Sequence, residues 1–168
     1  METVYFQTTP CHTYGSVPAV GTTAPEFDLV SADLAPVNNH EYRGKRLVLN
    51  IFPSLDTAVC AMSVRRFNAE AAKMDNTAVL CVSMDLPFAA KRFCTAEGIE
   101  NLTVASAFRS PRFGQEYGVQ LVDGPLAGLL TRCVLIIDEN GKVIFRDLVD
   151  EITHEPDYEA ALNVLKRK

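Results

Sequence analysis

The sequence predicts an α/β protein with a central mixed β-sheet flanked by helices. Apolar runs of strand length alternate with amphipathic segments of helix length through the middle of the chain. Near the end of the chain, Asn140-Gly141 separates two strand-like runs, which indicates an antiparallel hairpin. Alternation of strands and helices favours parallel pairing, and the hairpin adds antiparallel strands, so the sheet is expected to be mixed.

The first fifteen residues are expected to form a β-hairpin outside the main sheet. Residues 3–7 and 10–14 are rich in Thr, Tyr and Val and lie on either side of a turn near Pro10. Residues 15–25 contain Gly and Pro and are interpreted as a connecting loop. A short strand at residues 27–30 then enters the sheet.

The clearest local signal is a strand followed at once by a helix. Residues 46–52 form a continuous apolar run that ends at Pro53, as a buried strand does when it reaches a loop. Residues 57–74 carry apolar side chains at helical spacing, and Asp56 or Thr57 is available as the N-cap. A strand-to-helix junction is therefore predicted near residues 53–60.

The remaining elements follow from the same signals. They are strands at residues 78–84, 101–105, 133–138 and 142–148, and helices at residues 87–97, 111–117 and 157–166. A βαβ half joined to an antiparallel edge is the arrangement of thioredoxin-like folds. Because no repeat, low-complexity tract or linker is present, we expect residues 1–168 to form a single domain, with residues 1–15 as the added N-terminal β-hairpin.

Charge and hydropathy argue against two classes of partner. The formal net charge is -5 and the basic residues are scattered, whereas nucleic acids and anionic membranes require a clustered basic face. The longest apolar runs are far shorter than the roughly 20 residues that span a bilayer. The start of the chain lacks the pattern of a signal peptide, so we expect a cytoplasmic protein whose thiols begin reduced.

Five cysteines occur, at positions 11, 60, 81, 94 and 133. An odd number without a Cys-x-x-Cys pair disfavours a structural disulfide framework, and the histidines show no metal-ligand spacing with the cysteines, so no metal or other cofactor is expected. Cys81 and Cys133 lie inside apolar strands and are interpreted as core residues, and Cys11 as incidental.

Cys60 differs from the other cysteines because it lies where the predicted helix begins. A thiol in the first helical turn is close to free N–H groups and to the positive end of the helix dipole, and both favour the thiolate. Thr57 is three residues earlier, so its hydroxyl lies on the same side of the first turn and could hydrogen-bond the thiolate or an oxygen atom of a substrate. A lone cysteine at a helix start is otherwise most often a packing residue.

The segment Pro53-x-x-x-Thr57-x-x-Cys60 resembles the active-site signature of the peroxiredoxins. Nearly the whole chain is similar to the bacterial thiol peroxidase subfamily, through Asn50-Ile-Phe-Pro-Ser54, Asp56-Thr57, Pro87-Phe88, Arg92-Phe-Cys94, Asp123-Gly-Pro-Leu126 and Asp150-Glu-Ile-Thr153.

This resemblance implies a thiol-dependent peroxidase that reduces hydrogen peroxide and organic hydroperoxides. It implies that Cys60 attacks the peroxide, that Thr57 and Pro53 shape its pocket, that Arg132 supplies a guanidinium and that Cys94 resolves the oxidised sulfur. It also implies reduction of a Cys60–Cys94 disulfide by thioredoxin, and a homodimer.

Cys94 lies near the end of a different predicted helix from Cys60. A disulfide requires α-carbons within about 7 Å, so both helices are expected to loosen after Cys60 becomes a sulfenic acid. Resolution by another thiol, with Cys94 as a packing residue, is the alternative.

A disulfide oxidoreductase and a redox sensor are the alternatives to a peroxidase. A thioredoxin-like disulfide oxidoreductase would require Cys-x-x-Cys at the junction, where Ser63 stands instead, and a proline in place of Thr131. A redox sensor or binding protein that uses the same cysteine pair remains the alternative function. An apolar pocket around Phe52, Leu55 and Val59 would favour alkyl hydroperoxides.

Overall fold

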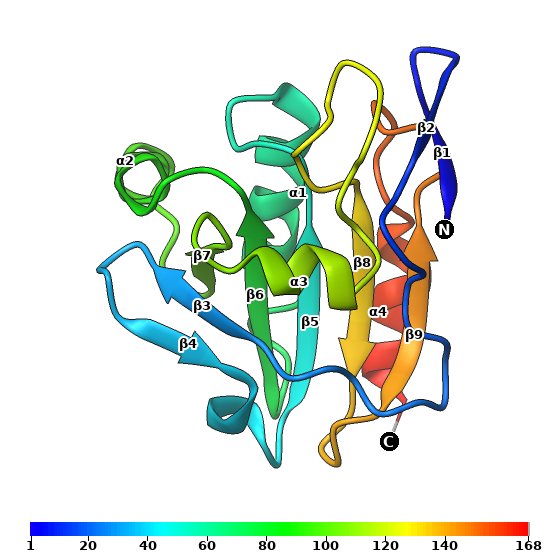
Figure 1. Cartoon of the computed structure of the whole chain (residues 1–168). Helices are drawn as coiled ribbons and strands as arrows, with labels where there is room; N and C mark the ends of the chain where they lie inside the picture. The colour runs from blue at the N-terminus through cyan, green and yellow to red at the C-terminus, as the bar shows by residue number, and fades with distance from the viewer. Residues whose placement is uncertain (168) are drawn as a thin grey trace.

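A seven-stranded mixed sheet forms the centre of the computed structural model, which describes residues 1–167, and a two-stranded hairpin stands beside it (Figure 1). In chain order the elements are β1 (Thr3–Phe6), β2 (Thr9–His12), β3 (Asp28–Ser31), β4 (Pro36–Asn38), the 3-10 helix η1 (Asn39–Tyr42), β5 (Arg46–Ile51), α1 (Ala58–Ala69), β6 (Thr77–Ser83), α2 (Pro87–Glu97), β7 (Thr103–Ser106), α3 (Pro111–Glu116), β8 (Cys133–Ile137), β9 (Val143–Leu148) and α4 (Tyr158–Lys166).

The strand order explains how the two halves of the chain meet. The sheet runs β4-β3-β7-β6-β5-β8-β9, with β5, β6 and β7 parallel and the strands on either side antiparallel. The predicted mixed sheet and N-terminal hairpin are confirmed. Because β5 pairs with both β6 and β8, the junction that follows β5 lies beside the start of β8.

Two hydrophobic cores cover the two faces of the sheet. Along β5, Leu47, Leu49 and Ile51 point into one core and Val48 into the other, as the two-residue period of a strand requires. Figure 1 shows α3 in front of the sheet and α1 and α4 behind it. The core behind the sheet contains Cys60, so α1 packs its first turn directly against the central strands.

Several boundaries differ from the sequence-based expectation. The helix predicted over residues 57–74 ends at Ala69. There the carbonyl of Phe67 accepts from the N–H groups of both Ala71 and Ala72, and the second bond, five residues apart, closes a wider turn than that of an α-helix. Strand β4 and η1 were not predicted. Strand β4 has three residues and begins with a proline, so it lacks both the length and the composition of a recognisable strand.

The turn between β8 and β9 is also less regular than expected. Only Gly141 of the Asn140-Gly141 pair has a positive φ, of 83°, and the register shifts between Ile136 and Ile137. Within residues 1–167, no helix has the length and apolar character needed to cross a membrane.

Candidate active site

Cys60 is the third residue of α1 and is fully buried. Strand β5 ends at Ile51, and the loop that follows turns the chain into α1 behind the sheet. The side chain packs in the same core cluster as Phe52, Leu55 and Val64. The strand-to-helix junction therefore places this thiol at the start of a helix and in apolar surroundings.

Arg132 lies against the Cys60 sulfur, although 72 residues separate them in the sequence. Its Nη2 donates to Sγ at 3.2 Å, and its Nε donates to the carbonyl of Ile152 at 2.8 Å. The pairing of Ile51 with Cys133 brings Arg132, which immediately precedes β8, to the carboxyl end of β5. A buried guanidinium at this distance stabilises negative charge that develops beside it.

One nitrogen of the Arg132 guanidinium donates no hydrogen bond to the described residues. The Nη1 atom is buried and has no hydrogen-bond partner among the described residues. An unpaired buried donor is unfavourable unless something binds it, and Arg132 has only 2% of its surface exposed. The free donor lies on the same guanidinium that contacts the sulfur, so a small oxygen compound at Cys60 would find a charged donor beside it.

Thr57 is the N-cap of α1 and fixes its first turn. The Oγ1 atom accepts a hydrogen bond from the backbone N–H of Cys60 at 3.4 Å and donates one to the carbonyl of Ser54 at 3.1 Å. The bond reaches the backbone of Cys60 rather than its sulfur. Pro53 is buried at the end of β5, where its missing N–H does not interrupt the ladder.

Cys94 lies on α2 and is half-buried. It packs against the edge of the same core cluster that contains Cys60, and burial, with a smaller contribution from the Asp33 carboxylate, raises the pKa of its thiol. Cys94 also lines a cleft of about 220 Å³, together with Asp33 and Lys91. All five cysteines are free thiols in the structure, and Cys60 and Cys94 lie on separate helices, α1 and α2.

Comparisons with known proteins show the family to which the chain belongs. The Redoxin family model matches residues 19–162. A thiol peroxidase of Corynebacterium glutamicum is 55% identical over 165 residues, which is 98% of this chain and 99% of that protein. A thiol peroxidase of Mycobacterium bovis is also 55% identical, over 92% of each chain. The chain belongs to the Redoxin family, within the bacterial thiol peroxidase subfamily of the peroxiredoxins.

Solved structures agree with that membership. The crystal structure of a peroxiredoxin-like protein from Aquifex aeolicus superimposes with a TM-score of 0.94 at 43% identity, covering 99% of this chain and 96% of that one. A thiol peroxidase from Chromobacterium violaceum, at 19% identity, has the same fold with a TM-score of 0.87 over 98% of this chain and 95% of that one. The predicted thioredoxin-like fold is confirmed, and the chain is a peroxiredoxin-type peroxidase, an oxidoreductase.

The other three cysteines of this peroxiredoxin are buried, and none of them accepts a hydrogen bond from Arg132 in the described part of the chain. Burial raises the pKa of Cys81 to about 12, although a hydrogen bond from Asn50 partly offsets this, and burial also raises the pKa of Cys133. Burial and the charge of Asp123 raise the pKa of Cys11. High pKa values keep these thiols protonated and unreactive at neutral pH.

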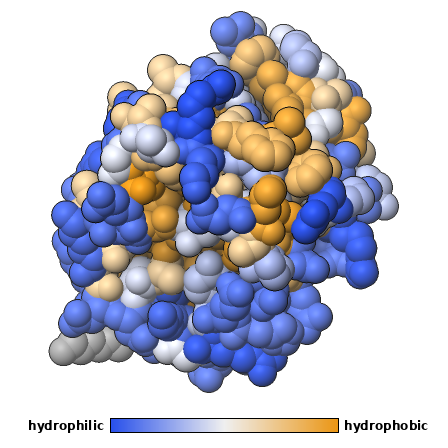
Figure 2. All heavy atoms as spheres, turned by 90° about the vertical axis from the view of Figure 1, so that its left-hand side faces the viewer, coloured by the Kyte–Doolittle hydropathy of each residue, from blue (hydrophilic) through white to orange (hydrophobic). Residues whose placement is uncertain are grey.

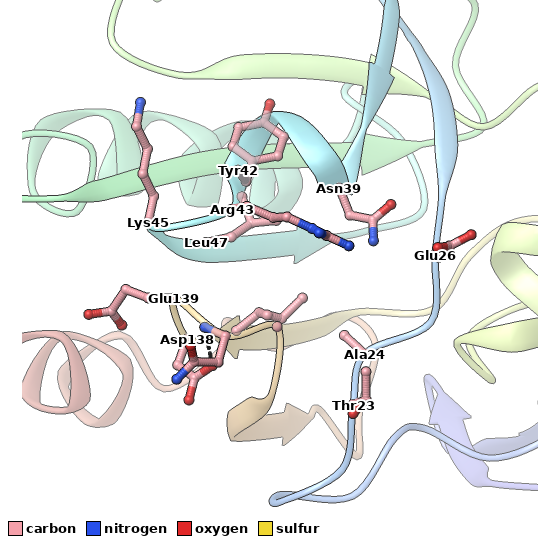
Figure 3. Close-up of a pocket in the computed structure, with 13 residues that line it drawn as sticks. Thr23, Ala24, Glu26, Asn39, Tyr42, Arg43, Lys45, Leu47, Asp138 and Glu139 are labelled. Atoms are coloured by element: carbon pink, nitrogen blue, oxygen red, sulfur yellow. Dashed lines mark hydrogen bonds between the residues drawn. The ribbon is translucent and has the colours of Figure 1, made fainter.

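A cavity of about 430 Å³ lies at the opposite end of the sheet from the peroxiredoxin cysteine. Figure 3 shows it between η1 and the start of β5 on one side, and the β8–β9 turn with Thr23 and Ala24 on the other. Its floor includes Leu47 and Ile137, a pair four residues along the ladder from Ile51 and Cys133. At about 3.3 Å per residue, this cavity is roughly 13 Å from the site, and it contains none of the predicted site residues.

Two contributors to the site were not indicated by the sequence analysis as functional residues. The carbonyl of Ile152 orients Arg132, and the carboxylate of Asp85 binds the loop between β5 and α1. Ile152 lies in segment 150–153, which is one of those similar to the thiol peroxidases. Its contact is made by the backbone carbonyl, so the identity of its side chain does not indicate the role. Among residues 1–167, no group of three or more His, Cys, Asp or Glu is placed to hold a metal ion.

Proposed function

We propose that this thiol peroxidase reduces hydroperoxides with Cys60 as the attacking thiol and Cys94 as the resolving thiol. The contact of 3.2 Å between Arg132 Nη2 and Cys60 Sγ carries the proposal. It pairs a thiol in the first turn of a helix with a buried guanidinium, and both surroundings stabilise negative charge on sulfur.

In the first step the Cys60 thiolate attacks one oxygen of the hydroperoxide. An S–O bond forms and the O–O bond breaks, which gives a Cys60 sulfenic acid and an alkoxide, or hydroxide from hydrogen peroxide, that takes up a proton. Negative charge moves from sulfur to the departing oxygen. The free Nη1 of Arg132 is available to donate to the reacting oxygens. One such donor lowers the activation free energy by about 3 kcal/mol.

In the second step Cys94 attacks the sulfenic acid sulfur. A disulfide forms and water leaves. The half-buried Cys94 has a raised pKa and lies on α2, so it is a weak nucleophile while that helix is folded. Loosening of α2 and of the first turn of α1 would expose Cys94, return its pKa towards the ordinary value and bring the two sulfurs together.

A dithiol must then return the disulfide to two thiols, and we propose thioredoxin for this role. The substrates are proposed to be hydrogen peroxide and alkyl hydroperoxides. Phe52 and Leu55 are buried near Cys60, and Val59 is partly buried, which supports an apolar approach for an alkyl group. Comparing the catalytic efficiencies for the two classes of peroxide tests this preference.

We further propose a cytoplasmic, single-domain homodimer. Leu86 and Phe88 at the start of α2 and Phe108 after β7 are large exposed side chains that follow the carboxyl ends of β6 and β7. Figure 2 shows hydrophobic surface gathered in the upper part of the face that carries α2. Exposed apolar surface of this kind supports association. In sedimentation analysis the wild type should be a dimer, and a Phe88→Asp substitution should convert it into a monomer. A wild-type protein that sediments as a monomer would contradict the proposal.

Turnover assays test the whole scheme. Peroxide consumption is measured with thioredoxin and its reductase for the wild type, Cys60→Ser and Cys94→Ser. Both variants should lose turnover, and Cys94→Ser should retain one fast oxidation. Full turnover by Cys60→Ser would refute the assignment. Slow turnover of the wild type with intact disulfide formation would instead support a redox sensor.

A further inference from the structure

The carboxylate of Asp85 connects the two segments that carry the proposed reactive thiols. Asp85 follows β6 and stands two residues before Pro87, the first residue of α2. Its Oδ1 accepts from the Ser54 hydroxyl at 2.8 Å, and its Oδ2 accepts from the backbone N–H of Leu55 at 2.7 Å. The Oδ2 atom also accepts from the Ser83 hydroxyl at 2.7 Å.

These bonds continue without a break to Cys60. The Ser54 hydroxyl, which donates to Asp85, accepts from the backbone N–H of Asp56 at 3.1 Å. The Ser54 carbonyl accepts from both the N–H and the hydroxyl of Thr57, at 3.2 and 3.1 Å. The Thr57 hydroxyl then caps the N–H of Cys60. Every turn of the loop between β5 and α1 is thus held by a chain of bonds that ends on Asp85.

The carboxylate has no cation partner within residues 1–167, so these three donors are its main stabilisation. A carboxylate that accepts hydrogen bonds from a backbone N–H and two hydroxyls binds each more strongly than a neutral acceptor would. Within the loop, Thr57 is exposed, whereas Leu55 is buried in the core. Removing the carboxylate would remove the bonds to the Ser54 hydroxyl and the Leu55 N–H, and it would leave the backbone hydrogen bonds of the strands and of α1 in place.

We propose that Asp85 is a positioning residue for peroxide reduction: it holds Ser54 and Leu55 so that Thr57 and the first turn of α1 present the Cys60 thiolate to Arg132. The inference rests on the proposed role of Cys60. Asp85 does not touch the sulfur, and its effect passes through the loop. A displacement of the reacting groups by about 1 Å lowers a rate by about 100-fold, so a loosened loop is expected to slow the reaction by about 10- to 100-fold.

Asp85→Ala and Ser54→Ala, each in a Cys94→Ser background, test the proposal. Two rates are measured for Cys60 by quenched reaction and mass spectrometry: oxidation by hydrogen peroxide and alkylation by iodoacetamide. Alkylation needs a thiolate but no donors on a departing oxygen. Asp85→Ala should lower the ratio of peroxide rate to alkylation rate at least tenfold, and Ser54→Ala, which keeps the Leu55 bond, should lower it less. Asp85→Asn, which retains one acceptor oxygen, should recover part of the loss.

Matched controls separate this role from a structural one. Asp75→Ala removes an exposed carboxylate that accepts no hydrogen bond in the described part of the chain, and its ratio should equal that of the background protein. A ratio within twofold of the background for Asp85→Ala would overturn the inference. If Asp85→Ala unfolds, Ser54→Ala is used in its place, and a ratio within twofold of the background for that variant would overturn the inference. Failure of peroxide to oxidise Cys60 in the background protein itself would instead overturn the proposed function.

Discussion

The Arg132 guanidinium lies 3.2 Å from the Cys60 sulfur through Nη2, while its Nε is fixed to the Ile152 carbonyl. The backbone contact sets the plane of the guanidinium before any substrate arrives. The third nitrogen, Nη1, is buried without a partner in the described residues. A preoriented donor of this kind costs no rearrangement during the reaction, which is why it contributes so much to a rate.

Substitution of Arg132 should therefore slow the oxidation of Cys60 strongly. Arg132→Gln is expected to lower the rate about 100- to 1000-fold, which corresponds to about 3–4 kcal/mol. Arg132→Lys keeps a positive charge but cannot contact Ile152 and the sulfur together, so an intermediate rate is expected. Single-turnover oxidation by peroxide measures both. The exposed Arg43→Lys serves as the control, and a normal rate in Arg132→Gln would contradict the assigned role.

Substitution of Thr57 by serine and by valine should have different effects on activity and stability. Thr57→Ser keeps the hydroxyl that bonds to the Cys60 N–H and to the Ser54 carbonyl, so activity and stability should change little. Thr57→Val removes both bonds and should cost about 1 kcal/mol of unfolding free energy and about 10- to 100-fold in rate. Urea unfolding and peroxide consumption provide the measurements. A Val variant that is less stable but fully active would limit Thr57 to capping.

Weakening the end of α2 should speed disulfide formation if that helix must loosen. Gly98 has φ of 66° and its N–H bonds to the Cys94 carbonyl, and an added Cβ there would meet no atom within 4 Å. Gly98→Ala thus adds only the left-handed backbone penalty of about 1 kcal/mol, which corresponds to roughly fivefold faster disulfide formation after a peroxide pulse.

Gly44→Ala is the control for this acceleration. Gly44 has φ of 83° and equally open space, but it lies between η1 and β5. Both variants should melt at a lower temperature, and only Gly98→Ala should form the disulfide faster. Equal rates in the two variants would indicate that α2 does not limit resolution.

Buried Cys81 should make the protein sensitive to alkaline pH. Its pKa is raised from 9.0 to about 12 in the folded chain, so the unfolded chain releases the proton first as the pH rises. The stabilising effect is fully present below pH 9.0 and is lost as the pH rises towards 12, by up to about 4 kcal/mol. In urea unfolding under reducing conditions, the stability advantage of the wild type over Cys81→Ala should shrink across this range. A difference in unfolding free energy between the two proteins that stays constant with pH would contradict this prediction.

Local signals predicted much of the fold, and long-range pairing supplied the rest. The bounds of α2 agree with the prediction because Pro87 and Gly98 are strong start and stop signals within the sequence itself. Arg132 could be linked to Cys60 only through the resemblance, since the contact depends on the pairing of Ile51 with Cys133. Asp85 was missed for the same reason: its partners are about thirty residues away, and an aspartate after a strand is usually a turn residue.

Peptide mapping after one equivalent of peroxide tests the central claim most directly. The reduced wild-type protein should yield a single disulfide between Cys60 and Cys94, and Cys94→Ser in the presence of a sulfenic-acid trap should carry the adduct on Cys60. A disulfide or adduct confined to Cys11, Cys81 or Cys133, with Cys60 still a free thiol, would contradict the account.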